Sequence, residues 1–453
     1  MQLVPLALRR DPVDVLACLA AEPGAFALDV PDAERPVTLF GCAPRARLTV
    51  HADGRVARSD GAGAPDDPLA AIEAFVGEAA RDDPLPFPLG GVIGYLAYEL
   101  GEWIERPRDG AGRRPDHPLA VLSRYDPMLV RDQRGQYVLA CARPESARAP
   151  WIGRLTAPTP AMPACALAPV PLAPLWPRER YLAAVRRILA YLVAGDAYQV
   201  NLTQPFTAPL AAPPCALYAR LARLHPVAYG AYLDIGPACL VANSPELFLR
   251  RRGDRVETQP IKGTRPRGTT TTRDAALAAE LAYDAKENAE HVMIVDLERN
   301  DLGRVARPGT VAVSSLARVE RHPSVQHLVS TVVGRLRPEV GLAALLRATF
   351  PGGSVTGAPK VRAMEIIREL ELAPRGAYTG AFGVLHPSGD VELGLAIRTA
   401  VVRDGVVRWH AGGGIVADSD PERELAETWL KTAALRLALG EAASPERERC
   451  SSG

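Results

Sequence analysis

The sequence predicts an α+β fold in which antiparallel strands and long helices follow one another without strict alternation. Two hairpin patterns and four helical patterns carry this prediction. Each hairpin has two strand-like runs around a short turn of Gly and Asp, within residues 247–261 and 391–411. Such turns join neighbouring antiparallel strands, whereas parallel strands need a longer crossover connection. The sheets are therefore expected to be largely antiparallel.

The hairpins also locate two candidate functional residues. Lys262 comes just past the end of the first hairpin, and Arg398 closes an apolar strand of the second. The strand-like runs are residues 247–252 and 256–261 around Gly253-Asp254, and residues 391–403 and 406–411 around Asp404-Gly405. Further strands are expected at residues 37–40, 47–50 and 137–141, and the glycine-rich stretch 90–99 fits either type of element.

Helical periodicity of the apolar residues predicts the four helices. They span residues 179–194, 275–297, 358–370 and 421–439. Gly195 follows the first of them and suits its C-cap, because glycine adopts the left-handed conformation that ends many helices.

A Pro- and Ala-rich segment, residues 142–177, divides the chain. Its composition opposes both helix formation and strand pairing, so we interpret it as a linker. It separates an N-terminal region, residues 1–141, from residues 178–440, which contain the candidate functional residues. Residues 441–453 are expected to form a frayed polar tail.

Composition excludes several functional classes. The 453 residues are 47% hydrophobic and carry a formal net charge of +1, with acidic and basic residues interspersed, which argues against a nucleic-acid or membrane partner. The seven cysteines include no CxxC pair, and no run of about twenty apolar residues occurs. No export signal is legible, so a soluble protein of the reducing cytoplasm is expected.

Lysine is rare in this chain: only four of the 53 basic residues are lysines. They are Lys262, Lys286, Lys360 and Lys431. Arginine stays charged, whereas a partly desolvated lysine can lose its proton and attack carbon. Lys262, in Gln-Pro-Ile-Lys-Gly-Thr, is therefore the first candidate for covalent chemistry, and an ordinary salt-bridging lysine is the alternative.

Two pairs of glutamates have helical spacing. Glu287 and Glu290 are three residues apart, as are Glu424 and Glu427, and Lys431 follows one turn later. Four carboxylates on partly apolar helix faces need a cation, and hard oxygen ligands without His or Cys suit Mg²⁺. The alternative is two solvated helix faces with an ordinary pair between Glu427 and Lys431.

The glycine-rich segment Phe-Pro-Gly-Gly-Ser-Val-Thr-Gly-Ala-Pro-Lys, residues 350–360, is expected to open a helix. Free backbone N–H groups at such a position bind anions. The segment is not a P-loop, because its lysine does not directly follow a glycine, so a carboxylate is a better ligand than a nucleotide phosphate. A structural turn is the alternative.

Four further residues are candidates by type and position. Arg398 could clamp a carboxylate bidentately, and Glu246, flanked by apolar residues between two strands, suits a general acid. Gln199 and His327 offer hydrogen-bonding groups, although lone residues of these types are more often structural.

Taken together, six motifs resemble the chorismate-utilising enzyme family over about residues 178–437. They are Gly-Asp-Ala-Tyr-Gln-Val-Asn-Leu, Ser-Pro-Glu-Leu-Phe, Pro-Ile-Lys-Gly-Thr-Arg-Pro-Arg-Gly, the segment from Lys286 to Arg304, the glycine-rich segment, and Ala-Gly-Gly-Gly-Ile-Val-Ala-Asp-Ser. The resemblance implies two packed, largely antiparallel sheets with helices on the outside. It also implies that chorismate, a small dicarboxylate, is the substrate.

The resemblance assigns roles to the candidate residues. It implies that Mg²⁺, held by Glu287, Glu290, Glu424 and Glu427, binds the ring carboxylate. It further implies that Arg398 and the loop with Gly353, Ser354 and Thr356 hold the enolpyruvyl carboxylate. The remaining expected substrate contacts are Thr264, Tyr378, Gly412, Gly413 and Lys431.

Lys262 selects the branch that the chain resembles most, aminodeoxychorismate synthase component I. Anthranilate, isochorismate and salicylate synthases typically have alanine at this position. In the implied reaction Lys262 attacks C2 of the ring while Glu246 protonates the departing C4 hydroxyl, and ammonia then adds at C4. Gln199 stands where water-adding members carry a lysine base, and His327 is placed in the catalytic set.

The resemblance also implies a partner. No glutaminase arrangement is legible in the chain, so ammonia is expected from a separate glutamine amidotransferase subunit. The alternatives are anthranilate synthase component I, and a catalytically silent homologue that binds chorismate.

Overall fold

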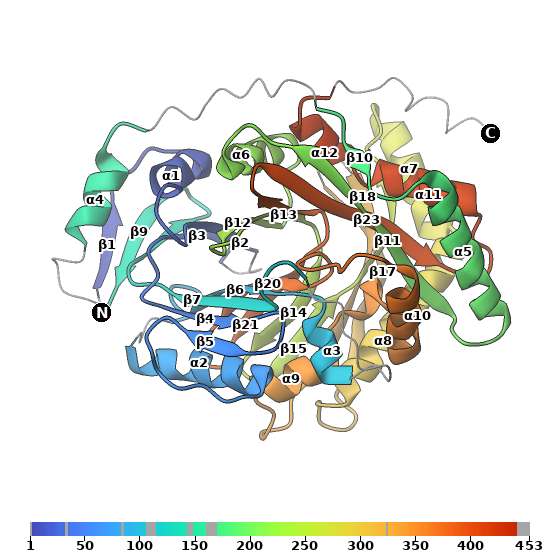
Figure 1. Cartoon of the computed structure of the whole chain (residues 1–453), viewed down its shortest axis with the longest axis horizontal. Helices are drawn as coiled ribbons and strands as arrows, with labels where there is room; N and C mark the ends of the chain where they lie inside the picture. Colours follow the sequence, from blue (N-terminus) through green and yellow to red (C-terminus); the bar gives the residue numbers. More distant parts are fainter. Residues whose placement is uncertain are drawn as a thin grey trace.

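The computed structural model describes residues 2–31, 35–82, 86–105, 115–142, 148–159, 170–322 and 325–441. Two large sheets face each other and helices cover their outer faces (Figure 1). All the strand pairings within the described residues are antiparallel. The predicted class, α+β with two packed, largely antiparallel sheets and outer helices, is confirmed.

The first sheet has 12 strands in the described part of the chain. In spatial order they are β1 (Gln2–Leu6), β9 (Tyr137–Cys141), β8 (Met128–Asp132), β3 (Val37–Gly41), β2 (Phe26–Val30), β12 (Tyr229–Asp234), β13 (Cys239–Ser244), β22 (Thr399–Arg403), β23 (Val406–Ile415), β11 (Gln199–Pro209) and β10 (Ala173–Pro174), with β19 (Gly357–Ala358) beside β11.

The second sheet has 11 strands, counted over the same ranges. In spatial order they are β16 (Ile261–Pro266), β18 (Val325–Arg335), β15 (Arg255–Gln259), β14 (Leu247–Arg252), β21 (Val391–Leu395), β20 (Ala381–Leu385), β6 (Val92–Leu96), β7 (Ala120–Arg124), β4 (Ala46–Val50) and β5 (Val56–Arg58), with β17 (Ala312–Arg321) beside β18.

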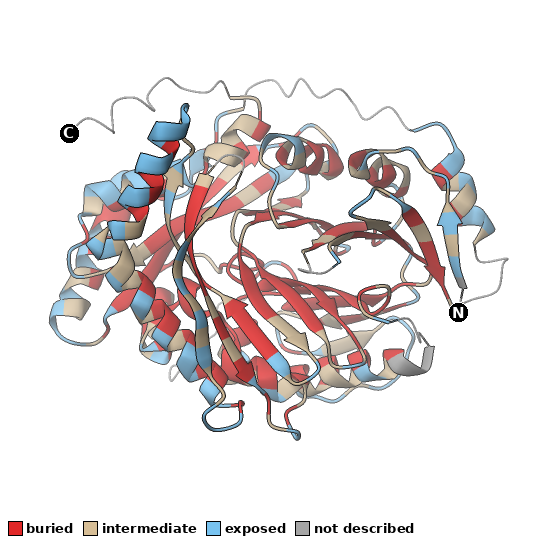
Figure 2. Ribbon diagram, turned by 180° about the vertical axis from the view of Figure 1, so that it is seen from behind, coloured by how far each residue is buried: buried red, intermediate tan, exposed pale blue. Residues whose placement is uncertain are grey.

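The helices and the core follow from this arrangement. The buried side chains gather on the two sheets, and the exposed ones lie on the outer helices (Figure 2). The helices are α1 (Pro12–Leu19), α2 (Pro68–Asp82), α3 (Leu100–Glu105), α4 (Ala149–Thr156), α5 (Arg178–Val193), α6 (Pro214–Leu224), α7 (Thr271–Tyr283), α8 (Ala285–Gly303), α9 (Leu342–Thr349), α10 (Lys360–Leu370), α11 (Pro421–Leu430) and α12 (Ala433–Ala438). None of the helices in the described ranges is long and apolar enough to cross a membrane.

Both sheets combine strands from the two ends of the chain. In the first sheet β2 pairs with β12, and in the second β6 pairs with β20. The regions 1–141 and 178–440 are therefore not separate structural units. The interpretation of residues 142–177 as an irregular linker is wrong at two places, α4 and β10. Trp151 and Leu155 of α4 are buried in the core, and Pro150 is tolerated in the first helical turn, where no N–H is needed.

Most predicted elements are confirmed. Of the predicted helices, two are each divided in two, and a third begins two residues later than predicted. The strands at 37–40, 47–50 and 137–141 are present, and the stretch 90–99 contains β6. The helix predicted over 275–297 is two helices, because the Asp284 carboxylate accepts a hydrogen bond from the Glu287 N–H and caps α8. The helix predicted over 421–439 is likewise α11 and α12, and the one over 358–370 begins at Lys360. Residues 442–453 of the predicted tail lie outside the described residues.

Two strand predictions are wrong where the site is formed. Lys262 does not follow a strand but lies inside β16, which starts after Pro260. The run 391–403 is not one strand, because the chain leaves β21 in the second sheet and enters β22 in the first. Arg398 lies in this crossing, with a φ of 48°. The pattern of apolar residues is the same for one long strand and for two shorter strands in facing sheets, because both arrangements bury the same residues. The pattern therefore did not predict the crossing.

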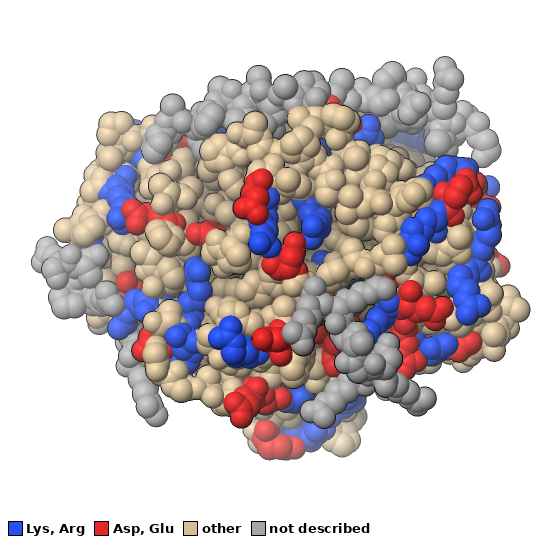
Figure 3. All heavy atoms as spheres, viewed as in Figure 1, with Lys and Arg blue, Asp and Glu red and all other residues tan. Residues whose placement is uncertain are grey.

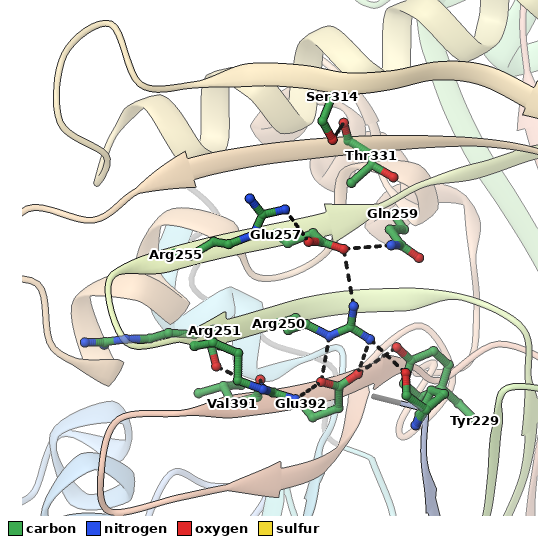
Figure 4. Close-up of polar contacts among 12 residues, drawn as sticks. Tyr229, Arg250, Arg251, Arg255, Glu257, Gln259, Ser314, Thr331, Val391 and Glu392 are labelled. Atoms are coloured by element: carbon green, nitrogen blue, oxygen red, sulfur yellow. Dashed lines mark hydrogen bonds and ion pairs between the residues drawn. The ribbon is translucent and has the colours of Figure 1, made fainter. Parts of the chain in front are cut away.

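A buried polar network stabilises the second sheet near the crossing (Figure 4). The Glu392 carboxylate, 2% exposed, accepts hydrogen bonds from Arg250 at 2.8 and 2.9 Å and from the Tyr229 hydroxyl at 2.9 Å. Arg252 donates a further bond at 2.5 Å. Removing the Glu392 carboxylate, or its guanidinium partners, would leave a charge in the protein interior without a counter-ion.

We expect Glu392→Leu to lower the free energy of unfolding by about 3 kcal/mol, because Arg250 and Arg252 lose their buried counter-ion. Urea denaturation measures the change. Glu339→Leu is the matched control, since Glu339 pairs with Arg337 at the surface, and it should leave the denaturation midpoint near wild type. Equal midpoint shifts for the two variants would contradict the assigned role of Glu392.

Candidate functional site

Two pairs of carboxylates, on α8 and α11, border the site. Burial raises the pKa of Glu290, and the negative charges of Glu287 and Glu424 raise it further, so the two pairs act on each other across the helices. Burial also raises the pKa of Glu424, to which the charge of Glu427 contributes. The four glutamates that the sequence singled out therefore form one electrostatic group.

Basic and polar groups partly satisfy these carboxylates. Glu287 lies 3.5 Å from the Arg265 guanidinium, and the Lys286 amine lies 3.9 Å from Glu290. On α11, Glu424 accepts a hydrogen bond of 2.6 Å from the Ser419 hydroxyl. No three His, Cys, Asp or Glu side chains in the described ranges are arranged to hold a metal ion.

Lys431 connects α11 to strand β23. Its amine lies 2.7 Å from Glu427 and donates to the Gly412 carbonyl at 2.7 Å. Gly413 lies against both carboxylates of α11, since an added Cβ would lie 3.3 Å from Glu424 Oε2, which is a tight contact, and 3.6 Å from Glu427 Oε1. The expected ion pair between Glu427 and Lys431 is thus present, and it lies against the glycines of β23.

Lys262 and Gln199 meet beside Gly414. A Cβ added at Gly414 would lie 2.8 Å from Gln199 Nε2 and 3.2 Å from Lys262 Nζ. Gln199 is fully buried, yet neither atom of its amide has a hydrogen-bond partner within the described residues. A buried amide with both groups unpaired is costly, which is a common feature of a site that binds a polar ligand.

The environment of Lys262 lowers the pKa of its amine. Burial lowers the pKa of this amine and the charge of Lys431 lowers it further, while Glu290, Glu246 and Glu427 oppose the shift. A desolvated amine with a lowered pKa is available as a nucleophile.

Glu246 lies between β13 and β14 and is 4% exposed. Its Oε1 accepts a hydrogen bond of 2.7 Å from the Ser354 hydroxyl, which links it to the glycine-rich loop. Burial raises the pKa of Glu246 to about 7, against the opposing effects of Ser354, Lys262 and Arg398. A carboxyl group that is half protonated near neutral pH is suited to donate a proton.

His327 lies on β18 opposite Thr264 of β16. Its Nδ1 lies 2.9 Å from the Thr264 hydroxyl, and burial together with the charge of Arg398 lowers the His327 pKa to about 3. The imidazole is therefore neutral at physiological pH and can act as one donor and one acceptor. The Arg398 carbonyl accepts a hydrogen bond of 3.0 Å from the Asn243 N–H, while its guanidinium makes no hydrogen bond or ion pair within the described ranges and is available for a ligand.

The hydroxyl groups of the glycine-rich loop already donate hydrogen bonds within the protein. The Thr356 hydroxyl donates to the Gly352 carbonyl at 3.0 Å, and the Ser354 hydroxyl is engaged by Glu246. Lys360 is buried against Asp301, so this lysine has a structural role. The short helical turn Gly353–Val355 thus presents mainly backbone to the site.

Sequence reasoning missed Arg375, which holds the loop in place. This buried guanidinium donates to the Val355 carbonyl at 2.8 Å and to the Asn201 carbonyl at 2.8 Å. It also donates to Glu371 at 2.7 and 2.9 Å and to the Thr379 hydroxyl at 3.4 Å. The spacing of Glu371 and Arg375 is that of an ordinary i,i+4 ion pair, and the two backbone carbonyls that Arg375 binds lie far away along the chain, so the sequence did not single this residue out.

His410 was also missed, since it is a lone histidine in an apolar strand. Tyr378, an expected substrate contact, stacks on it with ring centroids 5.3 Å apart. Contacts, or mutual effects on pKa values, therefore link the expected residues on α8, α11, β11, β16 and β23. Glu246 and Lys262 affect each other's pKa, and Arg398 affects the pKa of Glu246 and of His327, so these residues belong to the same group.

Comparison with known proteins matches residues 25–436 to the family described as chorismate binding enzyme. The chain belongs to this family. It is 42% identical to an aminodeoxychorismate synthase of Streptomyces griseus, over 89% of the chain and 58% of that relative, so it spans less than two thirds of that protein's length. It is 44% identical to anthranilate synthase component 1 of Thermus thermophilus, over 82% of each protein.

A solved structure, anthranilate synthase component I from Streptococcus pneumoniae, matches with a TM-score of 0.78 at 30% identity, covering 88% of this chain and 92% of that one. The family resemblance inferred from the six motifs is confirmed. Relatives with two different names are equally similar, so the comparisons alone do not select the reaction.

Proposed function

We propose that this protein is component I of an aminodeoxychorismate synthase, which converts chorismate and ammonia to 4-amino-4-deoxychorismate. The observation that supports this best is the Lys262 amine beside Gln199 and Gly414, with a pKa lowered by burial. Relatives that carry this name in Streptomyces griseus and Klebsiella aerogenes agree with it.

Glu287, Glu290, Glu424 and Glu427 fit a magnesium ion by the chemistry of their donors. All four are hard carboxylates, and burial raises the pKa of Glu290 and of Glu424, to which the charges of neighbouring glutamates add. When bound, Mg²⁺ would neutralise the ring carboxylate of chorismate and anchor it. Arg398 and the backbone of the glycine-rich loop would then bind the enolpyruvyl carboxylate.

The chain's own residues supply the covalent chemistry. The neutral Lys262 amine forms a bond to C2, the ring double bonds shift, and the C4–O bond breaks as Glu246 donates its proton, so that water leaves. Ammonia then bonds to C4, the double bonds shift back, and the C2–N bond to Lys262 breaks. The ionised Glu246 can accept the proton that the new C4 ammonium group loses, which restores both residues.

The ammonia would come from a glutamine amidotransferase subunit, and ammonium salts replace such a subunit in an assay. Anthranilate synthase component I is the second candidate, because the Thermus thermophilus relative carries that name. That reaction uses the same substrate but adds nitrogen at C2, where the proposed reaction forms its bond to Lys262.

We expect Lys262→Ala to slow aminodeoxychorismate formation by about 100-fold or more, because the nucleophile is lost. Lys262→Arg is the matched control, since it retains the length and charge of the side chain but cannot become neutral, and it should be equally inactive. Chromatography of reactions with chorismate, Mg²⁺ and ammonium chloride measures the product. Activity of the arginine variant would contradict covalent catalysis, and anthranilate as the wild-type product would contradict the proposed function.

The pH dependence of the rate tests Glu246. The proposed donor must be protonated, so the rate should fall as pH rises through about 7. Ser354→Ala should move this descending limb to higher pH, because the Ser354 hydrogen bond holds the pKa of Glu246 down. Glu246→Gln should reduce the rate by about 100-fold or more. An unchanged limb in the serine variant would contradict the assignment of that limb to Glu246.

A further inference from the structure

A small cavity lies among β22, β23 and the segment that leads into β20. Its volume is about 10 Å³, which is enough for a single molecule the size of water. The lining residues include His410, His117, Tyr378, Thr399, Val401 and Arg375. Water and ammonia are the two common molecules of this size that both donate and accept hydrogen bonds.

His410 is the unexplained residue of this cavity. It is 5% exposed, and neither of its ring nitrogens has a hydrogen-bond partner within the described residues. Burial, together with the charges of Arg375 and Arg408, lowers the pKa of His410 to about 3. The neutral ring offers one donor and one acceptor, and a small polar molecule in the cavity would satisfy them.

Charge in the lining disfavours a cation. Arg375 is paired with Glu371, and Asp116 is engaged by Arg408 at 3.1 Å and by Arg403 at 3.7 Å. The cavity therefore offers an ammonium ion no free carboxylate, and ammonium would have to displace one of these guanidinium groups. A neutral molecule needs no such change.

The cavity lies between exposed charged residues and Tyr378, an expected substrate contact. Arg408 and Asp116 at one end have side chains that are 41% and 46% exposed (Figure 3 shows such mixed charges on one face). At the other end Tyr378 stacks on His410, and the charges of Lys431 and Glu246 act on the pKa of Tyr378. Strand β23 runs from His410 to Gly414, beside Lys262, over about 13 Å at the usual rise per residue.

We propose that this cavity binds ammonia and delivers it to the substrate past Tyr378. The inference rests on the proposed function and adds the binding site of its second substrate. His410 supplies the hydrogen bonds, the cavity volume selects a molecule without carbon, and the balanced charges favour the neutral form. Ammonia released by a partner subunit and ammonia from solution would share this site.

The first test compares His410→Leu with His410→Gln, which keeps a donor and an acceptor. With chorismate and Mg²⁺ held at saturation, His410→Leu should raise the KM for ammonia by about tenfold and leave the KM for chorismate unchanged, and His410→Gln should stay near wild type. An unchanged KM for ammonia in a leucine variant with wild-type Tm would overturn the proposal, as would a raised KM for chorismate alone.

The second test is a gain of function, so that misfolding cannot imitate it. Val401→Ala removes two methyl groups from the lining, and the variant should then use methylamine, giving a product heavier by one methylene group in mass spectrometry. Wild type should use ammonia only. Methylamine use by wild type and variant alike, or by neither, would show that this cavity does not select the nitrogen substrate.

The two proposals fail separately. If wild type forms no aminated product from chorismate and ammonium chloride, both the proposed function and the proposed ammonia site are wrong. If wild type aminates chorismate and the His410 and Val401 variants behave like wild type, only the ammonia site is wrong.

Discussion

The site depends on one buried interaction, between the guanidinium of Arg375 and its partners. Glu371 accepts two of its hydrogen bonds, and the backbone carbonyls of Val355 and Asn201 accept two more. Val355 belongs to the glycine-rich loop and directly follows Ser354, whereas Asn201 belongs to β11 and lies two residues after Gln199. Because Arg375 is 3% exposed and fully hydrogen-bonded, it fixes the loop against the strand at little cost in unpaired charge.

This fixed frame explains the electrostatics of the reacting groups. Ser354 can hold Glu246 only while the loop stays in position, and Gln199 reaches the space near Lys262 only while β11 stays in register with β23. Lys262 and Glu246 influence each other's pKa in opposite directions, since each charge favours the other's charged form. Burial outweighs this attraction at both residues, so both are shifted toward their neutral forms.

The sequence predicted what is local and missed what is long-range. Most strands, the hairpin turns and the glutamate spacing depend on neighbouring residues, and they are present as expected. The break at Asp284 was missed because one capping side chain interrupts a continuous helical pattern. The crossing at Arg398 was missed because burial alternates in the same way on both sheets. Arg375 and His410 were missed because their importance comes from backbone carbonyls and a cavity that only folding brings together. The individual roles of the glutamates, Lys262 and Glu246 remain predictions.

One requirement unites the proposed nucleophile and the proposed cavity. An amine attacks carbon only through its lone pair, so both Lys262 and ammonia must be neutral at the moment of reaction. A protein can meet this requirement for both by the same means, namely burial among groups that are already paired. Lys262 lies beside an unpaired neutral amide, and the cavity lies beside an unpaired neutral imidazole. In each place the fold leaves a polar group without a partner. Lys431 occupies Glu427 near Lys262, and arginines occupy Glu371 and Asp116 near the cavity. Glu290 and Glu246 favour the charged form of Lys262, and burial outweighs them.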